Sequence, residues 1–169
     1  MTISLYQASV PLFKQMLNAL SEVLAKGAAD AETRKFEPAI LLQARLYADM
    51  FPLIRQVQIA SDFARGACAR LAGVEVPVMA QEQSSFADLT ALIAESIAFI
   101  DKLDPAQIDG QESREIILRP GTPKEKRMNA QAYLIHYALP QFFFHVTTSY
   151  AILRSQGVQV GKRDFMGAY

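Results

Sequence analysis

The sequence predicts an all-α protein: residues 1–169 form a single domain, an irregular antiparallel bundle of about four helices. Two observations favour this class. Apolar residues recur at steps of three and four along several long segments, which is the spacing of one face of an α-helix. Hydrophobic residues make up 51% of the chain and charged residues 20%, so there is enough apolar material for one core and too much for a disordered chain.

The first helix is expected to begin at Ser4, as its N-cap, and to end at Gly27. Pro11 lies inside the pattern and should weaken or bend the first turns. The polar residues 28–37 are interpreted as a connection. The apolar stripe of this helix consists of Tyr6, Val10, Phe13, Leu17, Leu20 and Leu24.

A second long helix is expected after a short helix or turn over residues 39–47. Asp49 is its predicted N-cap, Pro52 lies in its first turn, and Gly73 ends it. Small residues on its buried stripe indicate a close approach of a neighbouring helix. The stripe consists of Leu53, Val57, Ala60, Ala64, Ala67 and Leu71.

The third helix is predicted to follow a capping box formed by Ser85 and Asp88 and to run to Asp104. Residues 106–129 are irregular, but the short segment 115–118 is prone to form a strand and a Pro-Gly turn follows it. We therefore expect a short β-hairpin or flap before the last helix.

The fourth helix is expected to start at Asn129 or Ala130 and to continue to Gln156, with Gly157 as its end. Pro140 should kink or divide it, because a proline in a helix interior removes a backbone hydrogen bond and clashes with the preceding turn.

Composition excludes several classes of function. Lys plus Arg equals Asp plus Glu at 17 each, and no basic block is evident, so nucleic-acid binding is not expected. No apolar run approaches the ~20 residues of a membrane span, and residues 1–6 do not resemble a secretory signal. The single cysteine, Cys68, suits a reducing compartment and is interpreted as a buried helix residue rather than a reactive thiol. A cytoplasmic location is expected.

Two histidines are the first candidates for chemistry. His136 and His145 are nine residues apart, so they do not form a chelating pair on one helix face. Gln141 and His145 stand at i and i+4 and share a face. His145 is either a core histidine hydrogen-bonded to Gln141 or a ligand or acid–base group in a pocket, and the first interpretation is favoured. Gln56 is either a polar core residue or a remnant ligand.

Several segments resemble the DUF1993 family of bacterial proteins, which is grouped with the DinB/YfiT-like superfamily of metalloenzymes. The segments that carry the resemblance are 5–11, 44–46, 49–53, 55–60, 138–148, 151–154, 157–158, 161–162 and 164–165. The resemblance implies a four-helix bundle in which three histidines hold a divalent metal, one on the second helix and an H-x-x-x-H pair on the fourth. By this comparison His145 matches the second histidine of the pair, Gln141 the first, and Gln56 the ligand of the second helix.

Two of the three implied ligands are therefore amides, which bind zinc or nickel poorly. This predicts a degenerate metal site unless an acid such as Asp49 or Asp62 is recruited. The expected function is a homodimer or small-molecule binder, with Gln56, Gln141 and His145 as ligand-binding candidates and no catalytic residue identified. The alternative is a metal-dependent hydrolase or thiol transferase of the DinB type that uses His145. A DNA-repair role, suggested by the superfamily's name, has no support from the charge.

Overall fold

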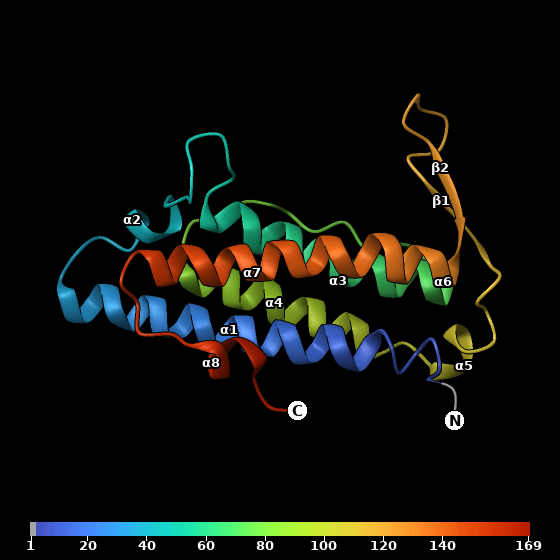
Figure 1. Ribbon diagram of the computed structural model, residues 1–169, viewed down its shortest axis with the longest axis horizontal. Coiled ribbons are helices and arrows are strands. Elements are labelled where there is room, and N and C mark those ends of the chain that lie inside the picture. The colour runs from blue at the N-terminus through green and yellow to red at the C-terminus, as the bar shows by residue number, and fades with distance from the viewer. Residues whose placement is uncertain (1–2) are drawn as a thin grey trace.

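The computed structural model describes residues 3–169, and its main body is a bundle of four long helices (Figure 1). The predicted bundle and the predicted hairpin are both confirmed. Residues 1 and 2, on which the expectation of no secretory signal partly rests, lie outside the described residues. The long helices are α1 (Val10–Arg34), α3 (Leu53–Ala72), α4 (Phe86–Ile100) and α7 (Leu139–Ser155).

Short elements lie at the ends of the bundle and along its side. Helix α2 (Ala39–Leu42) precedes α3, α5 (Pro105–Ile108) follows α4, and α8 (Lys162–Met166) packs against α1. Strands β1 (Glu115–Leu118) and β2 (Lys126–Asn129) form an antiparallel hairpin. Helix α6 (Ala130–Tyr133) and the π-helical turn η1 (Leu134–Ala138) lead from the hairpin into α7. Within residues 3–169, none of the helices combines the length and apolarity that a bilayer span requires.

The order of the helices around the bundle is α1, α4, α3, α7, as their mutual contacts show. The predicted antiparallel arrangement holds for α3 with α7, where Phe63 packs on Tyr137 and Gln56 on His145. Helices α3 and α4 run parallel instead, because residues 74–85 form an extended linker that returns the chain along α3 (Figure 1). The up-down-down-up order follows from this one long connection.

Helix α1 is longer than the sequence predicts at one end and shorter at the other. It begins at Val10, so Pro11 lies in the first turn, where a missing N–H costs little. It does not end at Gly27 but continues to Arg34, with Lys35 in the left-handed conformation at φ 56°. The expected connection over residues 28–37 is therefore largely helical. Gly27 is a site of close packing, because a Cβ there would lie 3.1 Å from Leu153 Cδ2.

The ends of α3 and α4 mostly agree with the prediction. Gly73 adopts φ 70° and closes α3, and Ser85 with Asp88 forms the expected capping box of α4. Asp49 is wrong as the N-cap of α3: the helix starts after Pro52, and Asp49 is exposed in the preceding loop. A polar residue in an N-cap pattern therefore does not fix the start of a helix when a proline nearby determines the first helical residue.

The fourth predicted helix is one continuous rod with a π-helical turn just before Pro140. Pro140 cannot donate to the preceding turn, and the wider hydrogen bonds of residues 134–138 absorb this defect without a break. Asn129 caps the start, accepting a hydrogen bond from the Ala132 N–H at 2.8 Å. The expectation that Pro140 could divide the helix is therefore wrong, and the disruption is limited to a local change of helix type.

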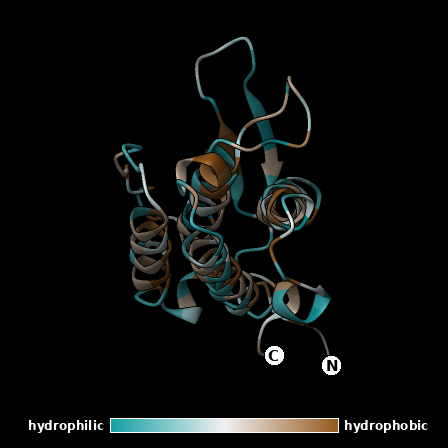
Figure 2. Cartoon of the chain, turned by 90° about the vertical axis from the view of Figure 1, so that its left-hand side faces the viewer, coloured by the Kyte–Doolittle hydropathy of each residue, from teal (hydrophilic) through white to brown (hydrophobic). Residues whose placement is uncertain are grey.

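The core fills the space between the four helices with aliphatic and aromatic side chains. Phe13 of α1 and Phe142 of α7 are fully buried and meet edge to face at 4.8 Å between ring centroids. Figure 2 looks along the helices and shows the hairpin and the outer loops standing away from this interior on one side of the bundle. That side carries the site described below.

Candidate functional site

Gln56 of α3 and His145 of α7 meet inside the bundle. His145 Nδ1 lies 2.6 Å from Gln56 Oε1, and the Gln56 Nε2 donates to the Phe51 carbonyl at 3.1 Å. Gln56 is 1% exposed and His145 8% exposed. The carbonyl of Phe51 fixes which way the amide points, so its oxygen faces the imidazole and His145 Nδ1 must be the donor.

This arrangement fixes the tautomer of His145. Because Nδ1 carries the hydrogen, Nε2 keeps its lone pair in the neutral ring. Burial, and to a smaller extent the nearby Arg55 cation, together lower the pKa of His145 to about 4. The imidazole is therefore neutral at pH 7.

Aromatic rings surround the His145 imidazole. Phe63 of α3 stacks on it at 5.9 Å between centroids and 17° between planes, and Phe144 meets it edge-on at 5.2 Å. Phe63 also packs against Tyr137 at 6.0 Å. The Gln56–His145 pair thus supports a row of aromatic side chains that continues toward the surface.

Gln141 is not part of the Gln56–His145 pair. Among the described residues it makes no hydrogen bond to either side chain, and it is half-buried beside Tyr137 and Phe144 in a surface hollow. The predicted core interaction of His145 is real, but the partner is Gln56 rather than Gln141. The structure therefore brings together two of the three candidate residues and places the third on the adjoining surface.

The residues present do not fit a tightly held divalent metal. The Gln56 oxygen is occupied by the Nδ1 hydrogen of His145, which leaves His145 Nε2 as the one free imidazole donor of the pair. Within residues 3–169, no three His, Cys, Asp or Glu side chains are grouped closely enough to hold an ion. Amide oxygens are weak ligands for zinc and nickel, and the Arg55 cation close to His145 opposes a second positive charge.

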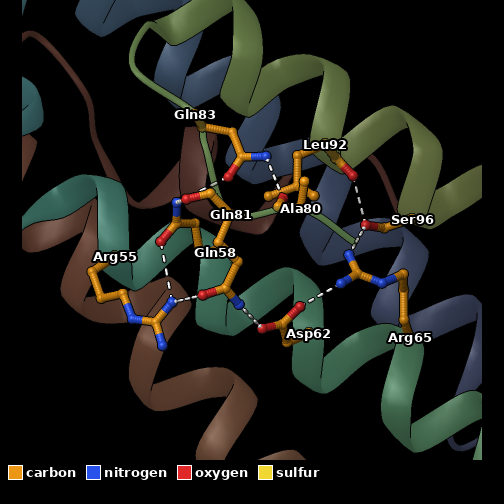
Figure 3. A network of polar contacts seen from close by, with 9 residues as sticks. All are labelled: Arg55, Gln58, Asp62, Arg65, Ala80, Gln81, Gln83, Leu92 and Ser96. Carbon is orange, nitrogen blue, oxygen red and sulfur yellow. Dashed lines mark hydrogen bonds and ion pairs between the residues drawn. The ribbon is translucent and has the colours of Figure 1, made fainter. Parts of the chain in front are cut away.

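The two acids that could have been recruited are also unsuited. Asp49 is exposed in the loop before α3. Asp62 is engaged by the buried Arg65 and by Gln81 Nε2 at 2.7 Å (Figure 3). Arg65 is 2% exposed and donates to Ser96 Oγ at 2.7 Å, so Asp62 serves as the counter-ion of a buried cation. The same network ties the extended linker to α3 (Figure 3).

A groove lies beside this region, between α3, the hairpin and the rod that contains α6, η1 and α7. Three adjoining hollows in the described part of the chain, about 220, 240 and 230 Å³ in volume, all have Tyr137 in their walls. We call this surface the hairpin groove. Its walls include Asp62, Phe63, Arg70, Leu118, Arg119, Lys124, Lys126, Tyr137 and Gln141.

The hairpin gives the groove its charge. Arg119, Lys124 and Lys126 line it, and none of them forms an ion pair within residues 3–169. Lys126 is paired with Leu118 across the ladder, on the face that carries the buried side chains of β1. Arg127, next along β2, points to the opposite face and pairs with Glu115 and Glu125. The acids of the hairpin therefore neutralise its outer face and leave the inner face basic.

The sequence reasoning missed these groove residues. The sequence did contain one indication of a basic surface, because residues 119–127 include four cations and one acid. What the sequence could not supply is the strand register, which decides which of them face inward. Phe63 and Tyr137 were equally hidden, since each is a common helix residue until α3 and η1 are placed side by side.

A larger hollow of about 630 Å³ lies at the C-terminal tail. Its walls come from residues 162–169 alone, and Tyr169 is 97% exposed. A surface made by one short segment offers few fixed groups from opposite sides, unlike the hairpin groove, which is enclosed by three elements. The hairpin groove is therefore the better candidate.

Comparisons with known proteins agree with this fold. A family model described as a domain of unknown function, DUF1993, matches residues 5–166. The crystal structure of a DinB family member protein from Shewanella denitrificans superposes with a TM-score of 0.91 and 36% sequence identity. The match covers 98% of this chain and 93% of that one. Among curated proteins, nothing matches the chain significantly.

Proposed function

Because the chain belongs to the DUF1993 family and has a DinB-like structural relative, we propose a function for it on the geometry of this fold: a metal-independent protein that binds a small molecule in the hairpin groove. The observation that carries the proposal is the convergence of three hollows on Tyr137, backed by Phe63 and closed on one side by the hairpin. Concave surfaces with an aromatic floor and a few polar groups are typical ligand sites.

Each candidate residue has a distinct role in this proposal. Gln141 lines the groove and offers an amide to the ligand. Gln56 and His145 lie behind Phe63 and Phe144 and hold these rings in place through their own hydrogen bond. The pair is therefore a positioning element and not a metal site.

The alternative, a metal-dependent hydrolase or thiol transferase that uses His145, has less support. The donor set is poor for zinc or nickel, as argued above. A pKa near 4 also makes His145 a weak general base at neutral pH, since efficient proton transfer needs a pKa near the working pH.

The test is ligand-observed NMR with a library of aromatic fragments, with and without EDTA. Fragments should bind wild-type protein equally in both conditions and should lose binding in Tyr137→Ala. Tyr150→Ala is the matched control, because Tyr150 is also a half-buried tyrosine of this rod but packs on Phe165, away from the groove. Stoichiometric zinc or nickel that disappears in His145→Ala, or fragment binding untouched by Tyr137→Ala, would overturn the proposal.

Self-association is a companion proposal, supported by the loop before α3. Tyr47 and Phe51 are 71% and 54% exposed, Leu46 of the same loop is 42% exposed, and Ile40 of the preceding helix α2 is 58% exposed. Exposed apolar clusters of this kind are typical of interfaces. Sedimentation equilibrium should give a dimer that Tyr47→Ser with Phe51→Ser converts to a monomer; a monomeric wild-type protein would rule it out.

A further inference from the structure

We propose that the ligand of the hairpin groove is an anion: a small planar molecule that carries a sulfonate-, carboxylate- or phosphate-type group beside an aromatic body. This inference rests on the proposed function and adds the chemical class of the ligand. The chain as a whole has no net charge, but the charges that line the groove are mostly positive.

The charge is one-sided. Arg119, Lys124 and Lys126 reach the groove from the hairpin without an ion-pair partner in the described chain, and Arg70 adds a fourth cation from α3. The single acid in the walls is Asp62, whose carboxylate already faces the buried Arg65. A concave surface with unpaired charges of one sign attracts ligands of the opposite sign.

The apolar part of the site faces these cations. Phe63 and Tyr137 lie side by side in the groove wall, with Leu118 on the hairpin side. A ring placed on Tyr137 would have the hairpin cations at its edge, which is the arrangement that holds an aromatic anion by stacking and charge together. Hollows of about 220 to 240 Å³ that adjoin one another at Tyr137 suit a molecule of one to three rings.

The backbone at Arg119 points the same way. Arg119 has φ 52°, in the left-handed region that a residue with a Cβ enters at a cost, yet a glycine is not used there. Its carbonyl accepts hydrogen bonds from Thr122, which closes the turn. Backbone conformations of this costly kind gather at functional sites, which favours a role for the Arg119 side chain in the groove.

Two dyes that differ in charge test the inference on the full chain. 8-Anilinonaphthalene-1-sulfonate is anionic, and N-phenyl-1-naphthylamine has the same rings without the sulfonate. We expect the sulfonate to bind more tightly, to weaken as salt is raised, and to lose about tenfold in affinity in the triple variant Arg119→Gly, Lys124→Gln, Lys126→Gln. Glycine relieves the left-handed backbone at 119, so this variant should fold as stably as wild type.

A matched pair on one strand gives the sharper control. Lys126→Gln and Arg127→Gln remove the same charge from neighbouring positions, but only Lys126 faces the groove. Lys126→Gln should weaken the sulfonate dye, and Arg127→Gln should leave it within about twofold. Equal effects of the two substitutions would overturn the inference.

The outcomes separate the two proposals. If both dyes bind equally and only Tyr137→Ala removes them, the groove binds small molecules without a preference for anions, and this inference alone fails. If neither dye responds to Tyr137→Ala, the proposed function fails with it. Displacement of the sulfonate by a single-stranded oligonucleotide, and not by naphthalene-2-sulfonate, would also overturn the inference, because the occupant would then be a nucleic acid.

Discussion

His145 of α7 donates its Nδ1 hydrogen to the side-chain oxygen of Gln56 on α3, with 2.6 Å between the two atoms. The hydrogen bond joins two antiparallel helices in the interior, at the position where the superfamily resemblance implies metal ligands. It satisfies both polar groups without an ion.

The stability of the protein should depend on the protonation of His145 between pH 7 and 5. The folded-state pKa is lowered to about 4, below the ordinary 6.5, so the unfolded chain takes up a proton first. The stabilisation that the neutral, hydrogen-bonded imidazole gives the folded state is fully present above pH 6.5 and is lost as the pH falls toward 4. Urea unfolding should show a loss of roughly 2 kcal/mol between pH 7 and 5.

The two histidines provide the control for that measurement. In His145→Asn this loss should be absent, since the asparagine amide can replace Nδ1 but does not titrate. His136 is exposed, and His136→Gln should keep the loss. A pH dependence that follows His136 instead of His145 would contradict the burial argument.

Gln56→Glu should raise the pKa of His145. A carboxylate within hydrogen-bond distance stabilises the imidazolium, and an upward shift of about one to three units relative to wild type is expected from NMR titration of the ring protons. Gln141→Glu introduces the same charge one helical turn before His145 and should shift the pKa less, because Gln141 makes no hydrogen bond to the ring in the described structure. An equal or larger shift from Gln141→Glu would contradict the assignment of Gln56 as the hydrogen-bond partner of His145.

Cys68 should be inert to thiol reagents in the folded protein. It is fully buried, and burial raises the pKa of its thiol far above the ordinary value, so almost no thiolate forms at pH 8. Ellman's reagent should report no reaction until urea unfolds the chain. An added cysteine at the exposed Ala25 should react at once under the same conditions, and native-state reaction of Cys68 at a comparable rate would refute the prediction.

Gly27→Val should destabilise the bundle by about 1 to 3 kcal/mol, the cost of overpacking a filled interior. A Cβ at this position would lie 3.1 Å from Leu153 Cδ2 and 3.2 Å from Phe86 Cε1, so these two side chains, from α7 and α4, must give way. Ala29→Val, on the exposed side of the same helix, should cost only a few tenths of a kcal/mol. Thermal unfolding of the two variants side by side provides the measurement, and similar losses would mean that α1 packs more loosely than described.

The features that the sequence predicted correctly are those decided locally. The capping box at Ser85 and the left-handed Gly73 depend on a few neighbouring residues, and both are where the pattern indicates. Gly27 shows the limit of such patterns. A glycine such as Gly73 ends a helix because its φ is positive, whereas Gly27 lies within a helix and lets neighbouring side chains approach closely. The sequence pattern alone does not distinguish these two roles, because the second depends on tertiary packing.

The candidate site was predicted only in part, because its contacts join segments that are distant in the sequence. Gln56 and His145 were both singled out, but the i, i+4 spacing favoured Gln141 as the partner of His145, and α3 supplies a closer one. The charged wall of the hairpin groove depends on the pairing of Lys126 with Leu118. A one-residue slip in that register would exchange the faces of Lys126 and Arg127 and remove the basic groove.

The π-helical turn at residues 134–138 gives the rod one more residue than an uninterrupted α-helix would need. Each residue advances the helical phase by about 100°, so deleting one of these five would swing α6 and the attached hairpin about 100° around the axis of α7. The four-helix core would keep its layers, while the basic strand would turn away from Phe63. The shape of the hairpin groove is thus a consequence of a single extra residue in one helix, and deletion scanning through this turn would separate the protein's folding from the proposed ligand binding.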